Sequence, residues 1–198
     1  IWKNAKQVIP NSQDLKELAL KTNKNQEIKL IKNGIDTKEF STLKKIRGIN
    51  NKITLISTGR LIKRKGYEYL LKSLENLKDF ELSLIGDGNQ EFNLKSLAKS
   101  LNVEVNFIGK LNHDKISSHL QKADIFILPS LNEGMSNSLL EAMACGLPII
   151  TTDTGGAQEL INNNGFIVKK QSSEEIKNAL QEYLKNPSLL SLHSKNSR

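Results

Sequence analysis

The stretch Asp124-Ile-Phe-Ile-Leu-Pro-Ser-Leu-Asn-Glu-Gly-Met-Ser-Asn-Ser-Leu-Leu-Glu-Ala-Met-Ala-Cys-Gly-Leu-Pro-Ile-Ile-Thr-Thr-Asp153 has the clearest pattern of secondary structure in this chain. Ile125 to Leu128 form a continuous apolar run, which is typical of a central strand buried on both faces of a parallel sheet. A polar loop follows, and then a helix over Ser136–Cys145 with Ser136 or Asn137 as its N-cap. A second apolar strand comes directly after the helix. The pattern therefore predicts a strand, a loop, a helix and a strand in that order.

Two carboxylates lie close to the start of this helix. Glu133 is in the loop before it, and Glu141 is within its early turns. Ligands bind at the carboxyl ends of strands in open parallel sheets, and a helix that starts there points unpaired N–H groups at a phosphate. Carboxylates beside those groups can accept hydrogen bonds from sugar hydroxyls. Spacing alone supports equally well a second interpretation without a ligand, in which Glu141 is a solvated helix residue and Glu133 is an ordinary loop charge.

Strands and helices alternate on both sides of this stretch. We predict strands over Ile53–Ser57, Glu81–Ile85, Glu104–Ile108, Ile125–Leu128, Leu147–Thr151 and Phe166–Val168, and helices over Lys65–Leu77, Glu91–Ser100, His113–Lys122, Ser136–Cys145, Ala157–Ile161 and Ser173–Leu184. Such alternation produces right-handed crossovers and a parallel sheet. We therefore predict an α/β fold, with a Rossmann-like parallel sheet and helices on both faces.

The two ends of the chain are less regular. Short strands over Lys6–Pro10 and Ile28–Ile31 flank an amphipathic helix that Asn11 or Ser12 caps. Residues 37–52 are polar and basic and are predicted to be a connector. The polar residues after Pro187 are predicted to form a loose tail.

The composition narrows the classes of protein and partner. The 198 residues include 29 Lys and Arg against 21 Asp and Glu, a formal net charge of +8. This excess favours anionic partners such as a nucleotide diphosphate or anionic lipid headgroups. Nucleic acid is the weakest of these, because aromatic residues make up only 5% and no nucleic-acid-binding motif is found. No apolar run approaches the roughly 20 residues that span a bilayer.

Cofactor and redox chemistry find little support in the sequence. No Asp-x-Asp motif and no His, Cys and carboxylate cluster has the spacing of metal ligands, so we expect no metal or other cofactor. His113, His119 and His193 are expected at the surface. Cys145, the single cysteine, is predicted to be a buried thiol, which fits a reducing cytoplasm. The chain begins with Ile, which favours a fragment of a longer protein.

A second predicted loop at the same end of the sheet is positively charged. Arg60 follows the first regular strand and Lys65 begins the next helix, so the two can flank one crevice. An Arg fork and a Lys point charge suit a diphosphate. The alternative is that both are surface charges in a basic loop with Lys63 and Arg64, and composition alone favours this alternative.

The sequence resembles the retaining GT-B glycosyltransferases of family four. Glu133 and Glu141 enclose seven residues, as in the Glu-x7-Glu signature of that family. Further motifs follow in the family's order: Asn33-Gly-Ile-Asp36, Gly59-Arg-Leu-Ile-Lys-Arg-Lys-Gly66, Ile85-Gly-Asp-Gly88, Phe107-Ile-Gly109 and Thr154-Gly-Gly156. The resemblance runs from about Lys3 to about Val168, which is most of the chain.

The resemblance implies the C-terminal, donor-binding lobe of a GT-B fold. Residues 1–40 would then be the end of the first lobe and the crossing segment, residues 41–186 the Rossmann-like nucleotide-sugar-binding domain, and residues 187–198 a polar tail. The remainder of the N-terminal lobe would be a partner that holds the acceptor. The chain by itself is therefore expected to bind a donor nucleotide and to transfer no sugar.

The resemblance also implies roles for particular residues. Arg60 and Lys65 would stabilise the leaving diphosphate, Glu133 would lie near the donor sugar, and Glu141 would hold the ribose hydroxyls. The remaining donor-binding positions would be Gly59, Gly86, Ile108, Gly109, Gly134, Met135, Ser136, Asn137, Ser138 and Leu139. The implied reaction is retaining transfer of a hexose from a nucleotide sugar to a hydroxyl of a glycan or lipid-linked acceptor. It would take place in the cytoplasm or peripherally at the inner face of the membrane.

Two other functions stay open. One is a different nucleotide-sugar enzyme on the same fold, such as a 2-epimerase, and the other is a non-catalytic nucleotide-binding module. The tight Glu-x7-Glu loop favours the transferase, and the presence of Arg60, Lys65, Glu133 and Glu141 speaks against an inactive module. A dehydrogenase is disfavoured, because the first regular strand is followed by Gly-Arg-Leu and not by Gly-x-Gly-x-x-Gly.

Overall fold

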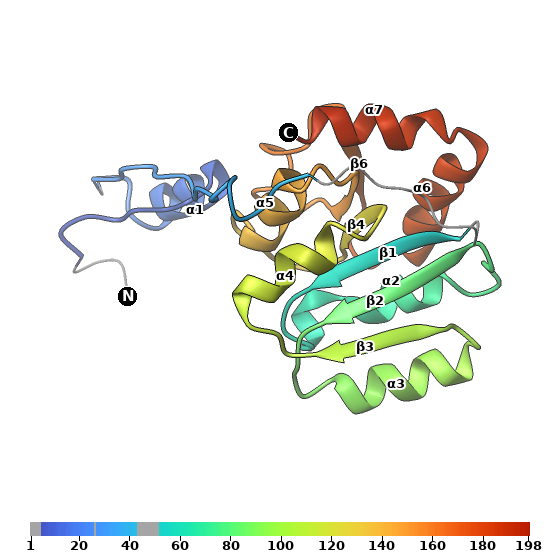
Figure 1. Ribbon diagram of the computed structural model, residues 1–198. Coiled ribbons are helices and arrows are strands. Elements are labelled where there is room, and N and C mark those ends of the chain that lie inside the picture. Colours follow the sequence, from blue (N-terminus) through green and yellow to red (C-terminus); the bar gives the residue numbers. More distant parts are fainter. Residues whose placement is uncertain (1–4, 26, 43–51) are drawn as a thin grey trace.

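The computed structural model describes residues 5–25, 27–42 and 52–198. A parallel sheet of six strands forms its centre, in the order β3-β2-β1-β4-β5-β6 (Figure 1). The strands are β1 (Ile53–Thr58), β2 (Phe80–Ile85), β3 (Val105–Gly109), β4 (Ile125–Leu128), β5 (Ile149–Thr152) and β6 (Gly165–Val168). The predicted α/β class and Rossmann-like parallel sheet are therefore confirmed.

Helices cover both faces of the sheet. They are α2 (Tyr67–Ser73), α3 (Glu91–Ser100), α4 (His113–Leu120), α5 (Asn137–Ala144), α6 (Ser173–Lys185) and α7 (Ser188–Asn196). Residues of α2, α3 and α6 share one core cluster with Leu55 and Ile127, whereas residues of α4 and α5 share the other with Ile56 and Phe126. Successive residues of a strand thus pack into different clusters, one on each face of the sheet. Every residue of β4 is therefore buried, which explains why all four are apolar.

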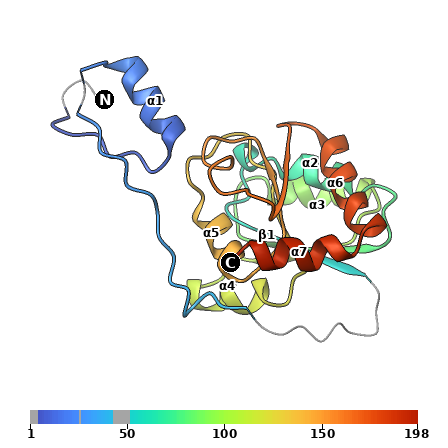
Figure 2. The ribbon, with the colours of Figure 1, turned by 90° about the horizontal axis from the view of Figure 1, so that it is seen from above.

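The N-terminal segment stands apart from the sheet. Helix α1 (Gln13–Thr22) begins after Ser12, whose hydroxyl accepts a hydrogen bond from the Leu15 N–H at 3.4 Å. Figure 2 shows that an extended stretch of chain then joins this segment to the sheet domain. The strands predicted over 6–10 and 28–31 are reduced to one parallel bridge between Val8 and Ile28. Two short stretches with no further neighbour gain too few ladder bonds to form a sheet.

The crossing between this segment and the sheet is better anchored than its composition suggests. Phe40 is fully buried in the α4 and α5 cluster. The Ser117 hydroxyl donates to the Glu39 carbonyl at 2.8 Å, and the Gln121 amide donates to the Ser41 carbonyl at 2.8 Å. Most of the predicted connector, residues 43–51, lies outside the described residues.

The predicted helix over Lys65–Leu77 is broken near its start. A single 3-10 turn, η2 (Lys63–Lys65), comes first, and Gly66 separates it from α2. Gly66 has φ 67°, and a Cβ at this position would collide with the carbonyl oxygen of Pro129. The bend holds the Lys63–Lys65 turn against the loop that follows β4.

Three further expectations are wrong. The helix predicted over Ala157–Ile161 is a series of turns, because the stretch between β5 and β6 is too short to propagate a helix. The loose tail expected after Pro187 is the helix α7, which buries Leu190. His193, expected at the surface, is buried on α7 and its Nδ1 lies 2.9 Å from the Tyr183 hydroxyl.

Candidate functional site

A cavity of about 580 Å³ opens at the carboxyl ends of the strands. Most of the residues singled out in the sequence line it: Gly59, Arg60, Lys65, Gly86, Glu133, Met135, Ser136, Asn137, Ser138 and Glu141. The loops after β1, β2 and β3 are held together by backbone hydrogen bonds, from the Gly59 N–H to Ile85 and from the Gly86 N–H to the Gly109 carbonyl. A Cβ at Gly86 would collide with the Gly59 carbonyl, so glycine is required for this close approach.

The other predicted residues lie beside the cavity and not in its lining. Ile108 and Gly109 form the end of β3, next to the lining residues Lys110 and Leu111. Leu139 is buried in the core beneath α5, and Gly134 packs against Leu15 and Asn11 of the N-terminal segment. The cavity therefore unites the two charged loops, and the β3 end forms its border.

A buried ion pair joins the two loops. Lys65 Nζ lies 2.8 Å from Glu133 Oε1, and the two side chains are exposed by only 11% and 12%. The contact is an ion pair without hydrogen-bond geometry, since Glu133 Oε1 has no hydrogen-bond partner among the described residues. A charged pair with an unsatisfied oxygen is costly to bury, so the site is suited to receive a polar ligand.

Arg64 fixes the position of the loop that carries Glu133. Its guanidinium donates to the Asn132 carbonyl at 2.6 Å, and its own carbonyl accepts from the Leu131 N–H at 2.8 Å. The guanidinium is also 3.7 Å from Glu133 Oε1. No local pattern predicts this role, because Arg64 lies among several basic residues. Arg60, in contrast, is exposed at the mouth of the cavity.

Glu141 also lines the cavity and is paired with a histidine. It is buried on α5, and its Oε1 lies 3.1 Å from Nε2 of His113. The hydrogen bond with Glu141 is the main cause that raises the pKa of His113, although burial opposes it. His113 keeps 58% of its side chain exposed, so its expected surface position is correct, but its contact with Glu141 was not foreseen.

The start of α5 lines the same cavity as these carboxylates. Ser136 is the N-cap residue, yet its side chain makes no capping bond and instead lies 2.9 Å from the Ser138 hydroxyl. The Leu139 and Leu140 N–H groups donate to the Ser136 carbonyl at 3.2 Å, so among the described residues the N–H groups of Asn137 and Ser138 are left for another acceptor. Backbone donors and the positive end of the helix dipole favour an anionic or hydroxyl-bearing ligand here.

Asparagines of the N-terminal segment close one side of the site. The Asn33 amide donates to the Met135 carbonyl at 3.2 Å and to Asn137 Oδ1 at 2.7 Å. The Met135 N–H donates to Asn11 Oδ1 at 3.4 Å. Further along, Lys32 pairs with Glu159 at 2.7 Å, and this contact lowers the pKa of Glu159. Residues separated by about a hundred positions thus meet at the loop before α5, which no local pattern predicts.

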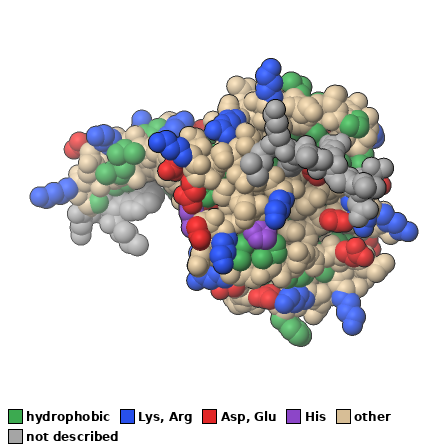
Figure 3. All heavy atoms as spheres, in the orientation of Figure 1, with side chains coloured by type: hydrophobic (Ala, Val, Ile, Leu, Met, Phe, Trp, Pro, Cys, Tyr) green, Lys and Arg blue, Asp and Glu red, His purple; other side chains and the backbone are tan. Residues whose placement is uncertain are grey.

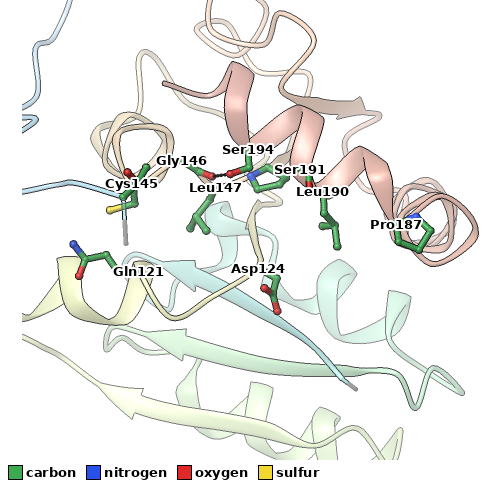
Figure 4. Close-up of a pocket in the computed structure, with 11 residues that line it drawn as sticks. Gln121, Asp124, Cys145, Gly146, Leu147, Pro187, Leu190, Ser191 and Ser194 are labelled. Carbon is green, nitrogen blue, oxygen red and sulfur yellow. Dashed lines mark hydrogen bonds between the residues drawn. The ribbon is translucent and has the colours of Figure 1, made fainter. Parts of the chain in front are cut away.

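A second cavity, of about 370 Å³, lies at the other end of the sheet (Figure 4). Its lining includes Asp124 and Leu147, which precede β4 and β5, and Ser194 of α7, which donates to the Gly146 carbonyl at 2.6 Å. Cys145 is buried there, as predicted, and burial raises its pKa to about 11. This end of a parallel sheet is not where ligands bind in such folds.

Three further observations concern the surface charge, metal ligands and membrane-spanning helices. Figure 3 shows Lys and Arg side chains scattered over the visible face among acidic ones, with no single basic patch. Among the described residues, no group of three or more His, Cys, Asp or Glu side chains could hold a metal ion. None of the helices in the described part of the chain is long and apolar enough to cross a membrane.

A six-stranded parallel sheet with a polar cavity at its carboxyl edge and a helix start facing that cavity defines the Rossmann-like class of nucleotide-binding domains. Within that class, residues 39–198 match the family described as Glycosyl transferases group 1. The chain belongs to this family. The identification made from the sequence motifs is therefore confirmed.

Similar proteins support this assignment. An uncharacterized glycosyltransferase of Haemophilus influenzae is 37% identical over 163 residues, which cover 78% of this chain and 45% of that protein. A GDP-mannose-dependent monoacylated alpha-(1-6)-phosphatidylinositol monomannoside mannosyltransferase of Corynebacterium glutamicum is 30% identical, with 78% and 46% covered. This chain thus spans about half the length of the curated relatives it matches.

Two solved structures have the same fold. Anabaena HepE in complex with UDP and glucose superposes with a TM-score of 0.86 at 25% identity, over 98% of this chain and 57% of that one. The C-terminal domain of the glycosyl transferase group 1 family protein LpcC from Francisella tularensis has a TM-score of 0.72 at 24% identity, over 83% of this chain and 94% of that one. The second comparison shows the fold of a GT-B C-terminal lobe.

Proposed function

We propose that this chain is the donor-binding half of a retaining glycosyltransferase and holds a nucleotide sugar in the cavity at the carboxyl edge of the sheet. The observation that carries the proposal is the buried Lys65–Glu133 pair, at 2.8 Å, which shares one cavity with Glu141 and the start of α5. Under this proposal, Lys65 would be the cation for the diphosphate, Glu133 the carboxylate for the transferred sugar and Glu141 the carboxylate for the ribose.

The positive groups of the site would act on the diphosphate. Breaking the bond between sugar and phosphate leaves negative charge on the departing nucleotide, and fixed cations in a site shielded from water stabilise that charge. Lys65 is positioned for this by its pairing with Glu133, and Arg60 is free to close from the mouth of the cavity. The N–H groups at the start of α5 would add dipoles of the same sign.

The carboxylates would hold the two sugars of the donor. Glu133 lies in the loop beside Lys65 and would accept hydrogen bonds from the transferred hexose. Glu141 also lines the cavity and would accept hydrogen bonds from the ribose hydroxyls, with the base near the lining residues Lys110 and Leu111 at the β3 end. Ile108 and Gly109 would contribute backbone groups to the base.

The relatives suggest which donors to test. One is described as GDP-mannose-dependent, and one was solved with UDP and glucose. Other relatives are described as enzymes of amylovoran and of lipopolysaccharide core biosynthesis, so the acceptor class we propose is a glycan or a lipid-linked sugar. Such an acceptor fits a cytoplasmic enzyme that contacts the inner face of a membrane.

The proposal assigns a role to each segment of the chain. Residues 1–40 would be the end of the first lobe and the crossing, residues 41–186 the donor domain, and 187–198 a terminal segment that folds back as α7. The partner lobe would hold the acceptor against the donor carbon, and such positioning contributes several kcal/mol to lowering a barrier. The 198-residue chain should therefore bind donor nucleotides and transfer no sugar.

A thermal-shift screen tests the proposal. The panel contains UDP, GDP, UDP-glucose and GDP-mannose, with inorganic pyrophosphate and the free nucleosides as controls. One nucleoside diphosphate should raise the melting temperature more than its nucleoside or pyrophosphate does. A chain that none of these compounds stabilises would contradict the proposal. Product analysis with the full-length parent enzyme would then separate a transferase from an epimerase or a binding module, and would show whether the anomeric configuration is retained.

A further inference from the structure

His113 lies between two carboxylates that come from different parts of the chain. It is the first residue of α4 and directly follows the loop after β3. Its Nε2 lies 3.1 Å from Oε1 of Glu141, and its Nδ1 lies 3.1 Å from Oε1 of Glu39. The ring also packs edge-on against Phe40, with 5.1 Å between ring centroids. Each ring nitrogen thus has a carboxylate oxygen as its partner.

Two carboxylate partners require a particular protonation state. A neutral imidazole has one N–H donor and one lone pair, whereas an imidazolium ion has two donors. Only the cation can donate to Glu39 and Glu141 together, and in the neutral ring one carboxylate would face a lone pair. The charged groups that face the ring are Glu141 from α5 and Glu39 from the crossing, while Asp114 and Lys115 follow it on α4.

The pairing leaves Glu141 with one oxygen for a ligand. Its Oε1 is taken by His113, and among the described residues no hydrogen bond to Oε2 is found. Glu141 lines the cavity, so the second oxygen is the one available to ribose hydroxyls. A carboxylate whose rotation is fixed by a cation at one oxygen presents the other in a defined direction.

We propose that His113, as a cation, is a positioning residue that orients Glu141 toward the ribose of the donor and ties that glutamate to the crossing segment. The proposal rests on the donor-binding function proposed above. His113 acts through Glu141 and has no contact of its own with the transferred sugar. Ser117 of α4 and Gln121, the C-cap of α4, donate from their side chains to the Glu39 and Ser41 carbonyls, so the crossing meets α4 at several points.

The proposal makes nucleotide affinity depend on pH in one direction. The pKa of His113 is raised above its ordinary value of 6.5, first by the hydrogen bond with Glu141. The ring is therefore a cation below the raised pKa and loses its second donor as the pH rises through it. Affinity for a nucleoside diphosphate should fall across that interval. Ionisation of the diphosphate itself affects wild type and variants equally and cancels in their comparison.

Titration calorimetry with UDP and GDP, from about pH 6 to about pH 9, tests this on the 198-residue chain. His113→Gln should weaken binding of the preferred nucleotide about three- to tenfold at the acid end and abolish the fall in affinity at higher pH. Glu39→Gln should keep tight binding and move the fall to lower pH, because one carboxylate partner of the cation is gone. His119→Gln, a change of the other histidine on α4, is the matched control and should behave as wild type.

Each remaining outcome is decisive. If His113→Gln binds with the affinity and pH profile of wild type, His113 does not orient Glu141. If wild type binds neither UDP nor GDP at any pH, the proposed function fails and the positioning role falls with it. In that case, an NMR titration of the His113 ring still tests whether His113 bridges Glu39 and Glu141. The pKa of the ring should drop in Glu39→Gln and in Glu141→Gln, and an unchanged value in both variants would show that no bridge forms.

Discussion

Lys65 Nζ and Glu133 Oε1 lie 2.8 Å apart in the lining of the cavity, and both side chains are largely withdrawn from solvent. They come from loops that follow different strands, β1 and β4, which are neighbours in the sheet. Each charge therefore neutralises the other. A diphosphate that enters would compete with Glu133 for Lys65, so the pair sets both the stability of the free domain and its affinity for the donor.

The first prediction concerns Glu133→Gln. The change leaves Lys65 buried without its ionic partner, so the free energy of unfolding should fall by about 2–4 kcal/mol, measured by urea denaturation. Affinity for a nucleoside diphosphate should rise several-fold, because a repelling carboxylate is removed. Glu91→Gln, in the solvent-exposed pair with Lys95 at 2.7 Å, is the control and should change stability by less than about 0.5 kcal/mol. Equal stability of Glu133→Gln and wild type would show that the pair does not form.

The second prediction concerns Glu141→Gln. The side chain keeps its shape but accepts hydrogen bonds from ribose hydroxyls less well, so a nucleoside diphosphate should lose about 1 kcal/mol of binding free energy. The matching 2′,3′-dideoxy nucleotide has no such hydroxyls and should lose much less. Calorimetry of the two ligands on the two proteins gives the difference directly. The same loss for both nucleotides would remove Glu141 from the ribose contact.

A third prediction tests the link between the two charged loops. Gly66→Ala introduces a Cβ at φ 67°, against the Pro129 carbonyl, so it should reduce the free energy of unfolding by about 2–4 kcal/mol. Gly34→Ala is the matched control, since a Cβ there meets nothing within 4 Å. If the two variants melt at the same temperature, the loop after β1 is not pressed against the loop after β4.

The fourth prediction concerns the last helix. Burial lowers the pKa of His193 from its ordinary 6.5, so the unfolded chain takes up a proton that the folded one resists. The contribution of the neutral ring to the free energy of unfolding should be fully present above about pH 6.5 and should be lost as the pH falls below that value. His193→Asn keeps an acceptor near the Tyr183 hydroxyl without titrating, so its unfolding free energy should vary less between about pH 7.5 and about pH 5. Identical pH dependence in the two proteins would contradict the buried position of His193.

Local sequence patterns were sufficient for the sheet and the two glutamates. The side chains of Ile125–Leu128 belong alternately to the two core clusters. The continuous apolar run therefore correctly predicted a strand buried on both faces. The glycines at 59 and 86 and the polar start of α5 marked where loops leave the carboxyl ends of strands. These signals are local, because each residue type fits a conformation set within a few positions.

Contacts between distant residues could not be predicted in this way. His113 contacts Glu39 and Glu141, which lie in two other parts of the chain. The number of residues between His113 and either glutamate matches no helix or strand period, so the sequence does not predict these contacts. Asn33 reaches Asn137 across the chain, and α7 is stable because Leu190 packs onto the core and not because its own sequence favours a helix. The predicted helix at Ala157–Ile161 failed for the opposite reason, since helix propensity does not outweigh a short connection between two strands.

The most direct test of the donor-binding account is titration calorimetry of a nucleoside diphosphate and its free nucleoside on four proteins: wild type, Arg60→Ala, Lys65→Ala and Lys63→Ala. Lys63 is exposed in the same basic loop and does not line the cavity, so it is the matched control. We expect Arg60→Ala and Lys65→Ala each to lose about 1.5–3 kcal/mol for the diphosphate and little for the nucleoside, with Lys63→Ala unchanged. Equal losses for diphosphate and nucleoside, or an effect of Lys63→Ala as large as that of Lys65→Ala, would contradict the account.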